Sequence, residues 1–317
     1  PGDLTGFHAD LRLLPNDGIG LFVGLNSDGT PVGLVDKSYT LRTVLFDEFL
    51  ERFFPTEPDA PEAAAPSGRE HAVLAAGEYE MSRQGEAYNF YDAIYLLYRV
   101  FLKSNEDGTI ETPAMISFTK SVPRTWREVS PFQWSEVDGD GRIYMKVVDG
   151  RVVSWLPDDL FSFEMLRVPF YRSATLNLPL LYFSVGILAL TVLVWPFAAW
   201  VRRRSGAVLA LTSRERWLRN LSLGAALLGL VYWFAWVAIF IAGVPEQLGQ
   251  EVWVRLVQSL GVVCIAGAII SLWHAALTCT VSRGMLARTG AILIALALLA
   301  LVWFSIVFHL ITIQLNF

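Results

Sequence analysis

The sequence predicts a multi-domain membrane protein, with a soluble part rich in β-strands first and four membrane-spanning helices after it. Three observations predict this: long uncharged apolar stretches in the second half, alternating apolar and polar residues in the first half, and opposite net charges. Residues 1–175 carry sixteen Lys and Arg against twenty-seven Asp and Glu, a net charge of −11. Residues 176–317 carry nine against three, a net charge of +6.

Four stretches are long enough to cross a membrane. A spanning helix needs about 20 mainly apolar residues, because the hydrocarbon layer is ~30 Å thick and a helix rises ~1.5 Å per residue. The helices of a soluble bundle would be the alternative, but they rarely stay free of Asp, Glu, Lys and Arg over such lengths. The uncharged stretches are residues 176–201, 221–244, 256–280 and 291–313.

The connections between these stretches predict their orientation. Lys and Arg are retained on the cytoplasmic side of membrane proteins. The first connection contains six Arg residues and the third contains Arg283 and Arg288, whereas residues 245–251 of the second contain no base. We therefore expect the first and third connections inside, and the second connection, the C-terminus and residues 1–175 outside. In a bacterium, outside means the periplasm or the cell exterior.

Charge and composition narrow the expected partners. An acidic soluble part without a basic stripe argues against nucleic acid as a partner.

Cys264 and Cys279 lie fifteen residues apart on one predicted helix, ~22 Å, so they cannot form a disulfide with each other. Residues 138–141 (DGDG) resemble the start of a calcium loop, but Arg142 takes a ligand position, which predicts a hairpin turn instead. We expect no cofactor and no metal.

Residues 1–54 predict two strands and a helix. In residues 7–13, Phe7 and the apolar residues after it alternate with His8, Asp10 and Arg12, as in a strand with one apolar face buried. The Asp17-Gly18 turn leads into a second strand at residues 19–25, and Ser38 can cap a helix with one apolar face. These elements are too small to bury their apolar surface alone. Because the chain opens in sheet-like sequence without Met, we expect it to be truncated and to have packed on something upstream.

Residues 55–72 and 73–175 predict a linker followed by a second soluble domain. Pro, Ala and acidic residues without periodicity mark the linker. Turn signals at residues 105–108, 138–141 and 149–150 then separate strand-like runs, which predicts a small antiparallel sheet or half-barrel. Residues 88–101 suit either a helix or a buried strand.

The opening residues, PGDLTGFH running into LLPNDG and LFV, resemble the C-terminal end of the serine β-lactamase-like, class C penicillin-binding family. In that family a His-x-Gly or Lys-Thr-Gly triplet on a strand is followed by a Gly-Phe stretch, a Leu-Pro-x-x-Gly hairpin and a closing helix. Pro1-Gly2 would be the end of a His-x-Gly triplet, so Gly2 is the one remnant of a catalytic motif. Residues 38–54 would be the closing helix.

The resemblance also covers the rest of the chain. Bacterial membrane-tethered members carry a lipocalin-like β extension and then a multi-span helical domain, and residues 78–80, 125–129 and 168–173 look like that extension. The resemblance implies three parts: a C-terminal remnant of an α/β serine hydrolase domain at residues 1–54, a small antiparallel lipocalin-like β domain at 73–175, and a transmembrane domain at 176–317.

The function that this resemblance implies is that of an exported serine hydrolase tethered to the bacterial cytoplasmic membrane. Its substrates would be peptide, ester or β-lactam carbonyls, attacked by the Ser of a Ser-x-x-Lys motif with help from Tyr-x-Asn. Neither Tyr-x-Asn nor a complete His-x-Gly occurs here, so no catalytic set is complete in this chain and we expect it to be inactive by itself. The alternative is a non-catalytic membrane module whose β domain binds a partner.

Five other residues could carry chemistry, and each has a simpler explanation. Ser117 and Lys120 spell Ser-x-x-Lys, but in a β-rich segment they would point to opposite faces of a strand. His8 could border an active cleft, although we expect it on the exposed face of its strand. His274 and His309 could mark a proton path, but the predicted topology separates them, so hydrogen bonding between helices or at the interface is expected instead.

Overall fold

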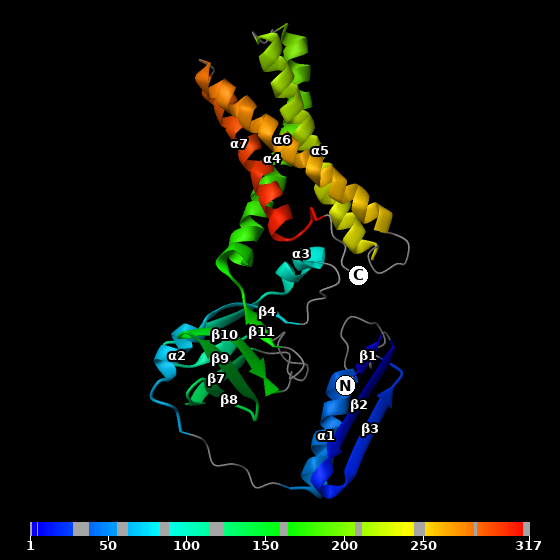
Figure 1. Cartoon of the computed structure of the whole chain (residues 1–317), viewed down its shortest axis with the longest axis vertical. Coiled ribbons are helices and arrows are strands. Elements are labelled where there is room, and N and C mark those ends of the chain that lie inside the picture. Colours follow the sequence, from blue (N-terminus) through cyan, green and yellow to red (C-terminus); the bar gives the residue numbers. More distant parts are fainter. Residues whose placement is uncertain are drawn as a thin grey trace. The chain divides into compact units, whose positions relative to one another are not determined.

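A computed structural model describes residues 2–4, 6–27, 38–55, 63–82, 89–113, 123–158, 164–206, 211–243, 251–281 and 284–312. The chain divides into two compact units (Figure 1). The first consists of Pro1–Ser82 and Val100–Arg167, and the second of Arg83–Arg99 and Val168–Phe317.

The first unit begins with a small antiparallel sheet in the order β1 (Gly2–Leu4), β2 (Phe7–Leu14), β3 (Ile19–Leu25). The predicted hairpin is confirmed: β2 and β3 pair along their length, and Gly18 takes a left-handed conformation (φ 66°) in the turn. A residue without Cβ enters that conformation most easily. The predicted helix is also confirmed as α1 (Ser38–Phe53), which lies along one face of the sheet (Figure 1).

The face of β2 that α1 covers is the opposite of the one we expected. His8 and Asp10 are buried, with 4% and 5% of their surface exposed, whereas Phe7 is 54% exposed. The reason lies on α1, where buried Arg42 donates a 2.6 Å hydrogen bond from Nη1 to the Ala9 carbonyl oxygen. The helix thus presents a polar anchor to the polar face, and the apolar face stays open. Its most exposed large side chains are Phe7, Leu11, Leu13 and Phe22, each more than half exposed.

The rest of the first unit is a closed barrel. Within the described residues, eight antiparallel strands follow one another around it, and the last pairs with the first (Figure 1). The sequence predicted a small antiparallel sheet or half-barrel, and the antiparallel pairing is confirmed. The sheet is in addition closed, which leaves no strand edge unpaired. The strands are β4 (Gly77–Met81), β5 (Val100–Ser104), β6 (Ile110–Thr112), β7 (Arg124–Ser130), β8 (Gln133–Glu136), β9 (Arg142–Val148), β10 (Arg151–Pro157) and β11 (Met165–Arg167).

Large aromatic side chains fill the barrel. Trp126, Trp134 and Trp155 are each at most 1% exposed and belong to one apolar core. Helix α2 (Gly68–Ala75) adds to this core, and its start lies inside the stretch that we expected to be a linker. The Tyr79 hydroxyl on β4 donates to the Ala75 carbonyl oxygen at 2.6 Å. Burial raises the pKa of Tyr79 to about 12, although the nearby Arg167 acts in the opposite direction.

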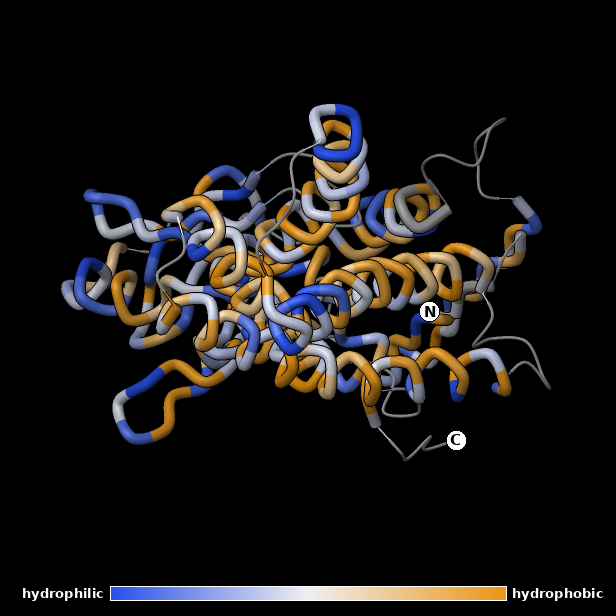
Figure 2. The backbone as a smooth tube through the Cα atoms, turned by 90° about the horizontal axis from the view of Figure 1, so that it is seen from above, coloured by the Kyte–Doolittle hydropathy of each residue, from blue (hydrophilic) through white to orange (hydrophobic). Residues whose placement is uncertain are grey.

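The second unit contains four helices that are long and apolar enough to cross a membrane, by length and composition within the described residues. This makes the chain a multi-pass membrane protein, and the long helical coils carry mainly hydrophobic colours in Figure 2. A capping box between Thr212 and Glu215 starts the second helix eight residues before the expected position 221. The helices are α4 (Ala174–Ser205), α5 (Ser213–Ile241), α6 (Glu251–Thr280) and α7 (Met285–Val307).

Small side chains and a few polar contacts hold the helices together. The Ser184 hydroxyl on α4 donates to the Ala297 carbonyl oxygen on α7 at 2.7 Å, and the Trp303 indole on α7 donates to Asn177 Oδ1 on α4 at 3.1 Å. Between α5 and α6, a Cβ built on Gly267 would lie 2.8 Å from the Ala225 Cβ. Close approach of small residues is typical of helix packing in membranes.

Residues 89–98 belong to the second unit, although they precede β5 in the chain. This segment forms short helical turns, including α3 (Asp92–Tyr95), which answers the question of helix or strand for most of residues 88–101. The Phe90 ring packs 5.2 Å from the Trp236 ring of α5. Asp92 forms a 3.0 Å ion pair with Arg172, and burial raises the pKa of Asp92.

Candidate functional site

Within each unit, the described residues that were singled out in the sequence do not form one site. Gly2 lies exposed on the edge strand β1, where it pairs with Ala9 of β2. His8 is buried on the face covered by α1, contrary to expectation. Ser117 and Lys120 lie outside the described residues, as does Pro1, so the structure tests neither the Ser-x-x-Lys motif nor the middle residue of the expected His-x-Gly triplet.

The histidines of the membrane part lie on different elements. His274 is near the end of α6 and lines a cavity between the helices. His309 follows the end of α7, where its backbone takes a left-handed conformation (φ 55°). Helix α7 follows α6 in the chain, so the end of α6 and the start of α7 lie at the same end of the helix bundle. His274 lies near that end, and His309 lies at the other.

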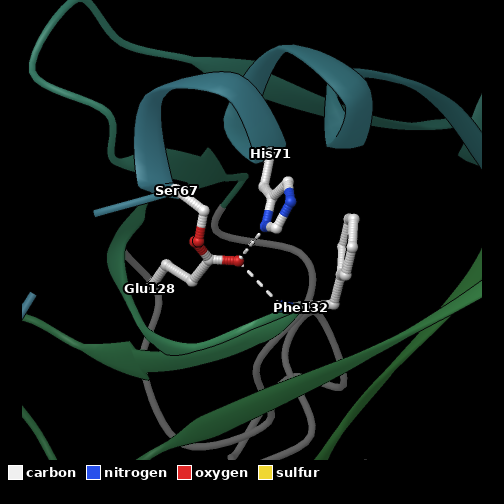
Figure 3. A network of polar contacts seen from close by, with 4 residues as sticks. All are labelled: Ser67, His71, Glu128 and Phe132. Atoms are coloured by element: carbon white, nitrogen blue, oxygen red, sulfur yellow. Dashed lines mark hydrogen bonds and ion pairs between the residues drawn. The ribbon is translucent and has the colours of Figure 1, made fainter. Parts of the chain in front are cut away.

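The barrel contains a cluster of Ser, His and Glu, which sequence reasoning missed (Figure 3). The Glu128 side chain on β7 is fully buried, and Ser67 Oγ donates to its Oε2 at 2.8 Å. The other oxygen, Oε1, lies 2.6 Å from His71 Nδ1 on α2 and accepts a 2.7 Å hydrogen bond from the Phe132 backbone N–H. The His71 ring also stacks on the Phe132 ring, with centroids 3.9 Å apart.

The order of these groups decides what the cluster can do. In a serine hydrolase triad the histidine lies between the carboxylate and the hydroxyl, so that it can take the hydroxyl proton. Here Glu128 lies between Ser67 and His71 and binds each through a different oxygen. The Ser67 hydroxyl donates to the carboxylate and not to the imidazole, so these three residues do not form the Ser-His-carboxylate relay of a triad. The cluster is a polar clamp that joins α2 and the β7–β8 turn to the barrel wall.

Phe132 gives the clamp a further constraint. Its φ of 60° is unusual for a residue with a bulky side chain. The N–H bond to Glu128 and the stacking on His71 hold it there. Alternation along β7 could have revealed the clamp, because Glu128 follows Arg124 and Trp126 at a spacing of two and all three are buried.

A second buried polar group lies in the barrel wall. Arg124 on β7 and Glu136 on β8 form an ion pair of 2.7 Å, and their side chains are only 4% and 6% exposed. The Arg124 guanidinium also lies 4.2 Å from the centre of the Trp126 ring. A pair with such close geometry satisfies two charges that would be costly to bury alone.

The barrel also has an open cavity of about 480 Å³ beside β9 and β10. Trp155, Ser154, Glu164 and Lys146 contribute to its lining. Ser154 donates a hydrogen bond to Glu164, whereas the Trp155 indole N–H has no hydrogen-bond partner within the described part of the chain. This cavity can accept a small ligand with both polar and apolar groups.

Metal chemistry receives no support from the described residues, since they contain no group of three or more His, Cys, Asp or Glu side chains able to hold an ion. Comparisons of the chain with protein-family models, curated proteins and solved structures gave no match. Function must therefore be argued from the geometry of the chain itself.

Proposed function

We propose that this chain is the C-terminal part of an exported, membrane-tethered serine hydrolase of the β-lactamase-like family, lacking the nucleophile. Residues 1–54 would complete the α/β hydrolase domain, with Gly2 as the remnant of a His-x-Gly triplet. The transmembrane helices would hold that domain at the membrane face, where peptide, ester or β-lactam carbonyls are its substrates. This proposal also assigns the membrane to a bacterial cell, with the soluble domains on the periplasmic or extracellular side.

The observation that carries the proposal is the open apolar face of the sheet β1–β3. Leu11 pairs with Phe22 on that face, and they are 57% and 68% exposed. The other face is covered by α1 through Arg42 and Phe46, which are almost fully buried. A sheet in an α/β domain is covered on both faces. A second layer supplied by a larger hydrolase domain would bury this surface.

The decisive experiment reads the gene upstream of the Pro1 codon and expresses the whole frame. We expect that frame to encode Ser-x-x-Lys, Tyr-x-Asn and a His immediately before Pro1, and the whole protein to react with a fluorophosphonate or penicillin probe. Replacement of the Ser of Ser-x-x-Lys by Ala should abolish labelling, and residues 1–317 alone should not react. An upstream frame without these motifs would refute the proposal.

Charged substitutions on the open face test whether this face is buried in the whole protein. In the whole protein, Leu11→Asp and Phe22→Asp should each expose residues 2–53 to proteolysis and reduce labelling, because a buried unpaired carboxylate is costly. Val73→Asp is the matched control, since Val73 on α2 is 66% exposed and lies outside this sheet. Equal effects of all three substitutions would show that the open face has no specific role.

A second candidate is a non-catalytic binding module, which the barrel cavity favours. Its ligand would contact Trp155 and Lys146, which line the cavity. Ligand-observed NMR with small amphiphilic acids should detect binding to residues 1–317, and Lys146→Ala should weaken it, whereas Lys103→Ala, an exposed lysine on β5 away from this lining, should not. An absence of binding, together with labelling of the whole protein, would leave the hydrolase as the only function proposed.

A further inference from the structure

The membrane part contains a partly open cavity of about 730 Å³ that neither candidate function uses. All four long helices contribute to it, at the end where α4 finishes, α5 begins, α6 finishes and α7 begins. The lining combines two kinds of surface. Polar groups come from α4, α5 and α6, and apolar side chains come mainly from α4 and α7.

Two arginines give the polar side of the cavity its charge. Arg202 on α4 and Arg219 on α5 both line it, and neither forms an ion pair with a carboxylate within the described residues. The Arg219 guanidinium lies 5.6 Å from the centre of the Trp195 ring, which holds it against the wall. Glu215 also lines the cavity, and its carboxylate accepts hydrogen bonds from the backbone and side chain of Thr212 in the capping box. The lining therefore has a net charge of +1 when His274 is neutral.

Three residues of the lining carry a buried polar atom without a hydrogen-bond partner in the described part of the chain. Ser222 on α5 is fully buried, yet its hydroxyl has no hydrogen-bond partner in the part of the chain that the structure describes. The same holds for the buried Nε1 of Trp195 and the buried Nδ1 of His274. Buried polar groups of native proteins are nearly always hydrogen-bonded, to protein or to something bound. A ligand with several acceptor oxygens would satisfy these groups.

The depth of the cavity matches the boundary between lipid headgroups and hydrocarbon. Helix α5 has 29 residues, about 43 Å, which equals the thickness of a bilayer with its headgroups. Arg219 is six residues from its start, about 9 Å along the axis, and Ser222 about 13 Å. The outer 5–8 Å or so on each side is the headgroup layer. With α5 spanning this thickness, Arg219 lies just below the headgroup layer, within reach of the lipid phosphates for a long side chain, and Ser222 lies about 4 Å deeper.

The apolar side of the cavity extends in the direction of the hydrocarbon. Val194 on α4 and Ile294 on α7 line it, together with Leu223 on α5. A free inorganic ion would gain nothing from these walls, whereas an acyl or prenyl chain would bury its surface against them.

We infer that this cavity binds the phosphate group of an anionic lipid, whose hydrocarbon chain lies along the apolar wall. Arg202 and Arg219 pair with the phosphate oxygens, since the guanidinium fork suits this geometry. Ser222 and Trp195 donate further hydrogen bonds. A phosphodiester with one negative charge would balance the net +1 of the lining, whereas a zwitterionic lipid would bring its own cation to the two arginines.

The test uses residues 1–317 purified in detergent, delipidated, and then titrated with phosphatidylglycerol, phosphatidylcholine or inorganic phosphate, with bound lipid counted by native mass spectrometry. We expect phosphatidylglycerol to be retained at least about tenfold more tightly than phosphatidylcholine, the factor that one charge-assisted hydrogen bond gives. Inorganic phosphate should not compete at the same concentration. Equal retention of the two lipids, or displacement by inorganic phosphate, would overturn the inference.

Matched variants separate this site from general surface charge. Arg202→Gln with Arg219→Gln should remove the preference for phosphatidylglycerol, whereas Arg216→Gln, on an exposed position of α5 outside the lining, should keep it. Ser222→Ala is a second variant, which separates a loss of lipid binding from a loss of folding. It should leave the melting temperature of the delipidated protein unchanged or higher, because it removes an unsatisfied hydroxyl, but it should reduce the stabilisation by phosphatidylglycerol. A double arginine variant that keeps the preference would contradict the site.

Discussion

His71 Nδ1 lies 2.6 Å from Glu128 Oε1, and this contact joins α2 to β7 over 57 residues of chain. Because the other carboxylate oxygen binds Ser67, the two residues at the start of α2 are both held by one buried side chain. The position of α2 on the barrel therefore depends on a polar contact as well as on its apolar residues Ala72 and Ala75.

Removal of the clamp carboxylate should loosen α2. We expect Glu128→Ala to lower the stability of this region by about 2–4 kcal/mol, because Ser67, His71 and the Phe132 N–H, all partly buried, lose their polar partner. Hydrogen exchange with mass spectrometry on the whole chain should then show faster exchange in peptides that cover Gly68–Ala75. Glu111→Ala is the control: Glu111 forms a 3.7 Å pair with the exposed Lys103, so its loss should cost less than about 1 kcal/mol. Equal exchange in the two variants would contradict a specific clamp.

The Tyr79 hydroxyl should make barrel stability sensitive to alkaline pH. Its pKa is raised from 10.0 to about 12, so the folded barrel holds the proton more tightly than the unfolded chain does. This contribution to stability is complete below pH 10 and is lost as the pH rises from 10 to about 12. Denaturant unfolding of the barrel should show this fall, and Tyr79→Phe should remove the part due to this group. The prediction fails if both proteins lose stability equally in that range.

The contact between α5 and α6 should not tolerate a larger side chain. Gly267→Leu would force the two helices apart, since even a Cβ there would lie 2.8 Å from the Ala225 Cβ. We expect a loss of about 1–3 kcal/mol, measured as a lower melting temperature of the detergent-solubilised chain. Gly224→Leu serves as the comparison, because a Cβ on Gly224 meets nothing within 4 Å. A similar loss in both variants would argue against close packing at Gly267.

Reporter fusions test the orientation in the membrane. An enzyme that is active only outside the cytoplasm should be active after Gly249 or Phe317 and inactive after Ser205 or Gly284, because Arg residues keep the first and third connections inside. The reverse pattern would put the soluble parts in the cytoplasm and remove the basis for an exported hydrolase.

Local sequence was sufficient for the elements whose cause is local. The Asp17-Gly18 turn fixed the β2–β3 hairpin, and the lengths of the uncharged stretches predicted the four apolar helices. The start of α5 could also have been predicted, from the Thr212 and Glu215 capping box. The start of α2 at Gly68 was missed because Pro, Ala and acidic residues dominate the preceding stretch.

The sequence by itself determined the β2–β3 hairpin, helix α1 and the four long apolar helices, because periodicity and length act over neighbouring residues. Only the tertiary structure decided which face of β2 is covered, since Arg42 of α1 lies 33 residues from Ala9. It also brought Ser67 to Glu128 across 61 residues, and Arg202 and Arg219 to His274 around one cavity. Such groupings arise when separate elements pack together, and a local sequence pattern does not predict which side chains will then be in contact.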